Sequence, residues 1–355
     1  MKTQRIKTIL LFLSTIPFMS IYAQSIYYVS PHALSGGDGS LAAPFHLIHE
    51  AVEKARKDKN CTTIYLREGK YILDKPLVLT SDDGNDLKEL VIKNYPGEKA
   101  IISSGIILDL KWEKYRNGMM RATVKGNPVM DMLIVNGDLK SMARYPDYDK
   151  NAVRFNGTSA LATAPERVKK WKHPEGGYLH AMHSHDWGDF HYRITGKNEK
   201  GELQLEGGWQ NNRPMGIHNE NRMVENIFEE LDVPGEWYYN KEEGRLYYYP
   251  LPDEKINELT FETPQLKNLI EFAGTLSAPV KNITIEGIEL TQTIRTFMEH
   301  YEPLLRSDWT IYRGGTVIFR GTEKCALRDC YIHNVGGNGV FFDKYNRYSA
   351  VTGSY

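Results

Sequence analysis

Short apolar runs separated by turn residues dominate the pattern of this chain. One segment, residues 44–59, differs, because Ile48, Ala51, Val52 and Ala55 recur there at helical spacing with charged residues between them. After it, runs of β-branched and aromatic residues alternate with Gly, Pro, Asn and Asp, which predicts many short strands. The first expected strands are residues 63–66, 71–73, 77–79, 90–92 and 100–102.

An internal repeat lies near the C-terminal end. Residues 285–290 match residues 327–332 at a spacing of 42, and a third copy begins 24 residues later at Val351. In a second register, residues 317–320 match residues 340–343 at a spacing of 23, and residues 270–273 resemble an earlier copy. A β-rich period in the low twenties predicts an all-β solenoid with one coil per repeat. The extra 18 residues of the longer step are expected within residues 293–315.

The repeat also predicts where side chains point. Side chains alternate along a strand, and equivalent residues of successive coils lie about 4.8 Å apart. We therefore expect Glu286 to lie over Arg328, and Arg320 over Asp343. The residues expected to point inward are Val317, Phe319, Val340 and Phe342, and those expected outward are Ile318, Arg320, Phe341 and Asp343.

One bend should be shared by the three copies. Gly287, Asp329 and Gly353 occupy the same position, where Gly, and Asp more than most residues, tolerates positive φ. The helix at residues 44–59 is expected to cap the apolar N-terminal end of the solenoid.

The sequence pattern changes between residues 109 and 262. Five of the six tryptophans and most of the histidines lie there, with hairpin patterns in place of the repeat. Residues 236–239 and 245–250 are expected to pair across a turn. These features predict a β-rich inserted domain at 109–262, between solenoid segments at 24–108 and 263–355.

Composition and charge exclude several classes of protein. The 355 residues are 41% hydrophobic and 25% charged, as in folded soluble proteins. The formal charge is −1, and loss of three cations with a leader would make it −4, so no basic field is available to bind nucleic acid. Nothing in the sequence indicates an oligomer, and we expect a monomer.

The first 23 residues resemble a secretory signal peptide. Lys2, Arg5 and Lys7 precede an apolar stretch that ends at Ala23, and this stretch is too short to span a bilayer. No cysteine follows to accept a lipid, which predicts a secreted or periplasmic protein without a membrane span; an uncleaved anchor is the alternative. The three cysteines, Cys61, Cys325 and Cys330, are interpreted as small core residues.

Several motifs together resemble a known family. They are residues 26–31 (Ile-Tyr-Tyr-Val-Ser-Pro), 66–71, 96–103, 187–196, 207–213 and 234–238. The chain resembles secreted right-handed parallel β-helix proteins of the pectate-lyase-like superfamily, most closely those like glycoside hydrolase family 141 with their insertion domain. The resemblance implies a right-handed parallel β-helix and a fucosidase- or xylanase-like enzyme acting on plant or host polysaccharide.

Glycoside hydrolysis usually needs two carboxyl groups. Asp343 is the best outward-facing acid on a recognisable strand, although an ion pair with Arg320 is an alternative role, and Asp308 is a candidate partner. A main pair beyond Tyr355 is a further alternative, because the chain stops five residues into a repeat and we expect a longer protein. The candidate substrate contacts are His333, Tyr345, Trp187, His191 and Trp209.

A histidine-rich segment contains residue types that bind metal ions. It contains His180, His183, His185 and His191 with Asp186 and Asp189, at spacings that match no standard metal motif. Hydrogen bonding or sugar contact is the preferred interpretation, and we expect no metal or cofactor. Trp187 and Trp209 could stack on sugars or fill the core. The alternative functions are a polysaccharide lyase of the same fold and a noncatalytic glycan-binding surface protein.

Overall fold

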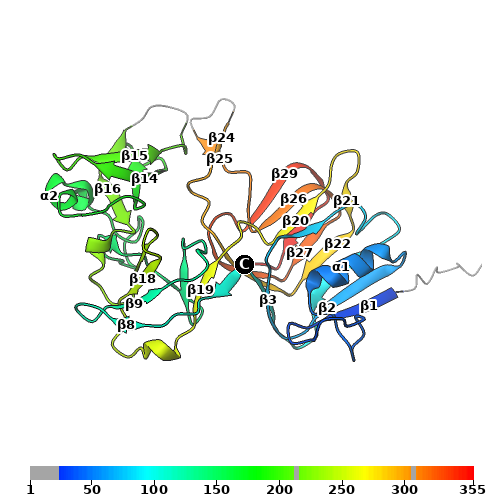
Figure 1. Cartoon of the computed structure of the whole chain (residues 1–355). Helices are drawn as coiled ribbons and strands as arrows, with labels where there is room; N and C mark the ends of the chain where they lie inside the picture. The colour runs from blue at the N-terminus through cyan, green and yellow to red at the C-terminus, as the bar shows by residue number, and fades with distance from the viewer. Residues whose placement is uncertain (1–23, 212–215, 305–308) are drawn as a thin grey trace, which may run out of the picture.

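The computed structural model describes residues 24–211, 216–304 and 309–355, which are mostly β-strand (Figure 1). The expected leader, residues 1–23, lies outside the described residues, and β1 begins at Gln24. No helix within the described ranges is long and apolar enough to cross a membrane. The helical segments are α1 (Ile48–Lys57), α2 (Pro165–Val168) and the 3-10 turns η1 (Ala160–Thr163), η2 (Phe228–Glu230) and η3 (Ile256–Glu258).

Three sheets contain only parallel strand pairs. The first sheet is formed, in spatial order, by β1 (Gln24–Val29), β2 (Cys61–Leu66), β5 (Leu90–Asn94), β22 (Ile283–Glu286), β27 (Ala326–Arg328) and β30 (Ala350–Thr352). The second is formed by β3 (Gly69–Ile72), β6 (Ala100–Ser103), β23 (Glu289–Thr293) and β28 (Tyr331–Val335). The third is formed by β4 (Leu77–Leu79), β20 (Ile270–Ala273), β26 (Val317–Glu323) and β29 (Val340–Arg347), with β21 (Val280–Lys281) beside β26.

The chain visits these three sheets in rotation. After β1, the order along the sequence is β2, β3, β4, then β5, β6, β20, then β22, β23, β26, then β27, β28, β29 and finally β30. All five early strands expected from the sequence are present. We call this part of the molecule the parallel region. Its three sheets and α1 enclose one apolar core, which includes Ile64, Ile285 and Leu327.

The predicted repeat registers are confirmed. Ile285 lies opposite Leu327, which lies opposite Val351, and Val317 lies opposite Val340. Phe319 stacks on Phe272 at 4.4 Å and on Phe342 at 4.6 Å between ring centroids. The two charged pairs also align as expected, with Glu286 opposite Arg328 and Arg320 opposite Asp343.

The shared bend is confirmed as well. Gly287, Asp329 and Gly353 have φ values of 68°, 50° and 63°, in the left-handed region that disfavours most side chains. The helix is shorter than its expected span, but its apolar face, formed by Ile48, Ala51, Val52 and Ala55, is buried as predicted, and α1 packs against β1 and β2.

Burial departs from the expected alternation at four positions. Phe342 faces the core but is 42% exposed, because it is the last ring of its stack, and Val340 is only partly buried. Ile318 and Asp343 were expected outside, yet both are buried, Asp343 between two arginines. Among the cysteines, Cys325 and Cys330 are buried core residues, whereas Cys61 is partly exposed at the start of β2.

Antiparallel sheets occupy the stretch between β6 and β20, which we call the insertion. One contains β11 (Asp138–Lys140), β10 (Leu133–Val135), β19 (Phe261–Pro264) and β7 (Gly105–Ile107). A second contains β12 (Arg144–Tyr145), β16 (Ile217–Glu225), β13 (Tyr178–His183), β14 (Asp189–Lys197) and β15 (Leu203–Gly207). A third contains β17 (Trp237–Asn240), β18 (Arg245–Tyr248), β9 (Met120–Thr123) and β8 (Glu113–Lys114), and its β17–β18 hairpin is the one that the sequence predicts.

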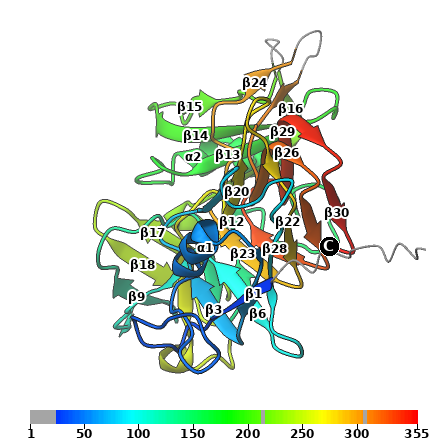
Figure 2. The same ribbon diagram turned by 90° about the vertical axis from the view of Figure 1, so that its right-hand side faces the viewer.

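The insertion and the parallel region lie at opposite ends of the molecule in Figure 1. The strands that lead into and out of the insertion, β7 and β19, pair with each other, Ile107 opposite Glu262. Figures 1 and 2 both show the sheet of β14 and β15 above that of β9 and β18. The excursion expected within residues 293–315 contains the antiparallel pair β24 (Glu302–Pro303) and β25 (Thr310–Ile311).

Candidate functional site

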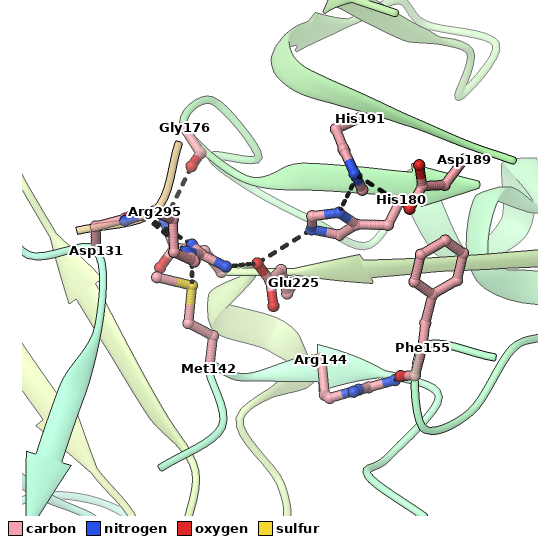
Figure 3. A network of polar contacts seen from close by, with 11 residues as sticks. Asp131, Met142, Arg144, Phe155, Gly176, His180, Asp189, His191, Glu225 and Arg295 are labelled. Carbon is pink, nitrogen blue, oxygen red and sulfur yellow. Dashed lines mark hydrogen bonds and ion pairs between the residues drawn. The ribbon is translucent and has the colours of Figure 1, made fainter. Parts of the chain in front are cut away.

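A chain of polar contacts joins the parallel region to the insertion (Figure 3). Its centre is Arg295, two residues after the end of β23, which reaches into the insertion. The Arg295 guanidinium donates to Asp131 Oδ1 through Nε and Nη2 at 3.0 and 2.8 Å, and Nη1 forms an ion pair with Glu225. The backbone N–H of Arg295 donates to Asp131 Oδ2 at 3.0 Å. This forked geometry fixes the guanidinium, because both carboxylates lie in its plane of donors.

The pairing of three strands brings the histidines to Glu225. On β13, His180 lies directly opposite His191 of β14, while Tyr178, two residues earlier on the same face, lies opposite Glu225 of β16. Directly opposite and diagonal neighbours on one sheet face are within side-chain reach. Accordingly, His180 Nε2 lies 3.1 Å from Glu225 Oε1, and His180 Nδ1 lies 2.7 Å from His191 Nδ1.

The charges in this chain of contacts stabilise one another. Burial would raise the pKa of Glu225, but Arg295 and His180 together hold it well below its ordinary value. Burial would likewise lower the pKa of Arg295, and the facing carboxylates Glu225 and Asp131 raise it instead. Glu225 and Arg295 are therefore an ion pair at neutral pH.

His191 is neutral at neutral pH. Burial, followed by the neighbouring His180, lowers the pKa of His191 to about 3. Its Nε2 lies 3.5 Å from Asp189, a carboxyl whose pKa is raised by burial. If His180 donates through Nε2 to Glu225, its Nδ1 accepts, and His191 must donate through Nδ1. The two rings thus form a relay in which His191 donates to His180 and His180 donates to Glu225.

Aromatic rings pack around this relay. Phe297 lies 5.1 Å from each of the Tyr178, His180 and His191 rings, and the Arg295 guanidinium lies 4.7 Å from the Phe297 centroid. Aromatic faces and a guanidinium at these distances attract each other and exclude water from the ion pairs. The site is consequently rigid.

Two cavities flank Arg295 and Asp131, which line both of them. The first cavity, of about 670 Å³, is also lined by Tyr178, Phe297 and Glu299. The second cavity, of about 650 Å³, is also lined by Arg144, Glu225, Glu236, Tyr148 and Trp237. Both volumes lie in the range typical of small-molecule sites.

Comparison with known proteins gives one informative match. A solved structure named "Glycoside hydrolase" superposes with a TM-score of 0.72 at 20% sequence identity over 89% of this chain. The fold is similar to that of a solved glycoside hydrolase. The chain spans 63% of the length of that protein. A structure named "The complex structure of XylC with xylose" matches more weakly, with a TM-score of 0.45, 14% identity and coverage of 89% of this chain and 41% of that one. No family model and no curated protein matches.

The predicted residues Asp343 and Tyr345 neither contact Arg295 nor line its two cavities. Asp343 on β29 forms ion pairs with Arg320 at 2.9 Å and Arg313 at 3.3 Å, so the ladder ion pair weighed in the sequence analysis is present. Asp308 lies outside the described residues. The Tyr345 hydroxyl donates to Glu323 beyond the left-handed bend at Lys344.

The predicted substrate contacts are scattered. On the second parallel sheet, His333 Nε2 is 2.8 Å from Glu289. Trp187 is 66% exposed and stacks on His183 at 5.3 Å between centroids, while Trp209 stacks on His300 at 4.5 Å. Of the five, only His191 belongs to the Arg295 site. Within the described parts of the chain, no group of three or more His, Cys, Asp or Glu residues is arranged to hold a metal ion.

Sequence reasoning missed Asp131, Glu225, Glu236 and Arg295. The sequence shows the histidine cluster, but Glu225 lies 45 residues after His180, and Arg295 lies a further 70 residues along the chain. One feature of the sequence could have indicated Arg295. It lies in the excursion after β23, which the repeat predicts as an addition to a coil. An added segment of a repeat protein commonly serves a binding face.

Proposed function

We propose that the protein is a secreted glycoside hydrolase that acts on a plant or host polysaccharide, with fucosidase- or xylanase-like specificity. The observation that carries this proposal is the pair of cavities around Arg295. Each has the size of a small-molecule site and combines aromatic rings with fixed donors and acceptors, which is the combination that sugar hydroxyls and ring faces require. The similarity of fold to a solved glycoside hydrolase agrees with it.

We interpret the three parallel sheets as a right-handed parallel β-helix. The strand order, in which the chain passes from sheet to sheet in rotation, supports this architecture. On this interpretation, residues 24–108 and 263–355 are helix coils, and residues 109–262 are an inserted β-rich domain held by the β7–β19 pair. The first cavity then lies where the inserted domain meets the coils, and the second lies in the inserted domain beside Arg295.

The catalytic carboxyls remain predictions. Asp343 and Asp308 are the proposed acids of the parallel region, and successive coils can provide either carboxyl spacing used by glycosidases. A matched test is the Asp343→Asn variant beside Glu286→Gln, since Glu286 is another acid on a parallel strand but pairs with Lys93. Loss of activity in the first variant alone would support the assignment.

Noncatalytic glycan binding is the second candidate function. It is favoured by Trp187, whose largely exposed ring lies flat on His183, with an interplanar angle of 8°. An exposed, supported aromatic face can stack on a sugar ring. In this case Trp187→Ala would remove binding to glycans while no glycan is cleaved.

One experiment separates these functions. The purified protein is incubated with glucuronoxylan, fucosylated mucin glycans and pectin, and reducing ends, ultraviolet absorbance and binding are measured. New reducing ends without absorbance support the hydrolase, whereas an absorbing unsaturated uronate would identify a lyase. Binding without products would identify a glycan-binding protein. If no glycan is bound or cleaved, the proposed function is wrong.

A further inference from the structure

The second cavity is lined by two buried ionisable side chains, Arg144 and Glu236, that form no ion pair among the described residues. Arg144 is 6% exposed, and its hydrogen bonds all go to backbone carbonyls, those of Pro146 at 2.8 Å, Phe155 at 2.7 Å and Gly157 at 3.1 Å. Glu236 is 3% exposed, and neither carboxyl oxygen has a hydrogen-bond partner among the described residues.

A buried guanidinium needs a counter-ion. Burial lowers the pKa of Arg144, and the carboxylates of Glu225, Glu236 and Asp147 oppose this effect when they are ionised. Glu225, however, is already bound by Arg295 and His180. Buried charges in proteins are normally paired, because an unpaired one loses its hydration without compensation. Among the described residues, Arg144 therefore forms hydrogen bonds to carbonyl oxygens and no ion pair.

Glu236 does not supply that anion at neutral pH. Burial raises the pKa of Glu236 to about 8; the backbone near Val233 opposes this, and Asp232 and Asp147 add to it. A neutral carboxyl group carries one O–H donor in addition to its acceptors. The other charged or titratable groups that line the cavity are Asp131, Lys140, Arg144, Tyr148, Glu225 and Arg295. Lys140 is paired with Glu254 at 3.3 Å, which leaves Arg144 as the cation without a carboxylate partner in this set.

We propose that the second cavity binds the carboxylate of an acidic sugar, a hexuronate, with Arg144 as the counter-ion and the protonated Glu236 as a hydrogen-bond donor. The sugar part of this inference rests on the proposed function. A carboxylate has two oxygens and one charge, which match one guanidinium and one O–H. The half-exposed Tyr148 ring, 5.9 Å from the Arg144 guanidinium, provides an aromatic surface for the sugar ring.

Isothermal titration calorimetry on the purified protein tests this site. The probes are sodium D-glucuronate, D-glucose and sodium acetate at pH 6 to 9. We expect saturable glucuronate binding that is at least tenfold tighter than that of glucose or acetate. Because binding needs the proton on Glu236, the affinity should fall by up to about tenfold per pH unit above about 8. Absence of glucuronate binding, or equal binding of acetate, would overturn the proposal.

Two variants connect the binding to these residues. Glu236→Gln keeps a neutral donor that does not titrate, so we expect glucuronate binding to be retained at pH 7 with no fall in affinity above pH 8. Arg144→Lys should weaken binding at least tenfold, since a lysine cannot reproduce the guanidinium fork; circular dichroism verifies its fold. Glu166→Gln, an exposed residue of α2, is the control. A Glu236→Gln variant that retains the wild-type pH profile would contradict the proposal.

The outcomes also separate this site from the proposed function. Glucuronate binding by a protein that cleaves no glycan would overturn the hydrolase and support the site. Cleavage of a glycan by a protein that does not bind glucuronate would overturn the site and support the hydrolase.

Discussion

Charged side chains are paired differently in the parallel region and in the insertion. In the parallel region, charged residues pair with the equivalent residue of the neighbouring strand, as Arg320 does with Asp343 and Glu271. In the insertion and at its junction with the parallel region, charges meet across elements remote in sequence, as Arg295 meets Asp131 and Glu225. Stacked repeats thus pair charges by register, whereas the insertion pairs them by tertiary packing.

This difference explains where the cavities form. A stack of similar strands fills its own interior, as the Phe272–Phe319–Phe342 rings do, and leaves no room for a ligand. The first cavity is lined by insertion residues and by residues of the segment 294–299 after β23, whereas the second is lined by insertion residues and Arg295. The chemistry-bearing groups therefore gather at the junction.

Removal of the central ring should have the largest effect on the parallel region. In Phe319→Ala, the cavity lies between two stacked rings and cannot collapse, so we expect a loss of about 4 kcal/mol in the free energy of unfolding. Urea denaturation measures it. Phe342→Ala is the matched control, because its ring is 42% exposed and should cost clearly less. Equal losses in the free energy of unfolding would show that the buried ring of the stack stabilises the core no more than the exposed one.

The corresponding change at the junction is Arg295→Gln. It leaves Asp131 and Glu225 without their cation, and breaking a buried pair in this way costs about 3 kcal/mol or slightly more. Urea denaturation measures this loss of stability as well. Lys125→Gln breaks an ion pair with Asp109 in which both side chains are largely exposed, so it should cost clearly less than Arg295→Gln. A mild Arg295→Gln variant would mean that the junction is held by packing alone.

The same contrast decides what the sequence could predict. Val317 and Val340 could be aligned because similar side chains recur at a nearly constant spacing, and the bend at Asp329 followed from its alignment with two glycines. The Arg295 site has no such recurrence. Glu225 and Arg295 are 70 residues apart, and only the folded chain reveals that they meet.

The histidine cluster illustrates the limit. His180 and His191 pair because the turn between β13 and β14 sets them opposite each other, an alignment that hairpin reasoning could have found. Their connection to Glu225 depends on β16, which joins the other side of β13 from a distance in sequence. Burial of Glu236 was equally invisible, since its neighbours in sequence form an ordinary hairpin.

A smaller effect is expected from the pH dependence of stability around Glu236. The folded state keeps its proton up to about pH 8, whereas the unfolded chain releases it near 4.5. The stabilisation by this proton is therefore complete below pH 4.5 and is lost as the pH rises toward 8. In urea denaturation, we expect Glu236→Gln to gain on wild type by up to about 1.4 kcal/mol for each pH unit between these values. A constant difference between the two proteins from pH 5 to 8 would contradict the buried, neutral state.

The smallest expected effect tests the shared bend of the parallel region. Asp329 has a φ of 50° between two equivalent glycines, and a left-handed conformation costs a residue with a side chain about 1–2 kcal/mol, less for Asp. In Asp329→Gly, this gain exceeds the added entropy of the unfolded chain only slightly, so we expect stabilisation by about 0.5 kcal/mol. The reverse exchange, Gly287→Ala, should destabilise more strongly, because its Cβ would also lie 2.2 Å from the Asn94 side chain. Opposite signs for the two variants in urea denaturation would show that the bend is a property of the repeat. The same sign for both would mean that each coil turns for its own local reason.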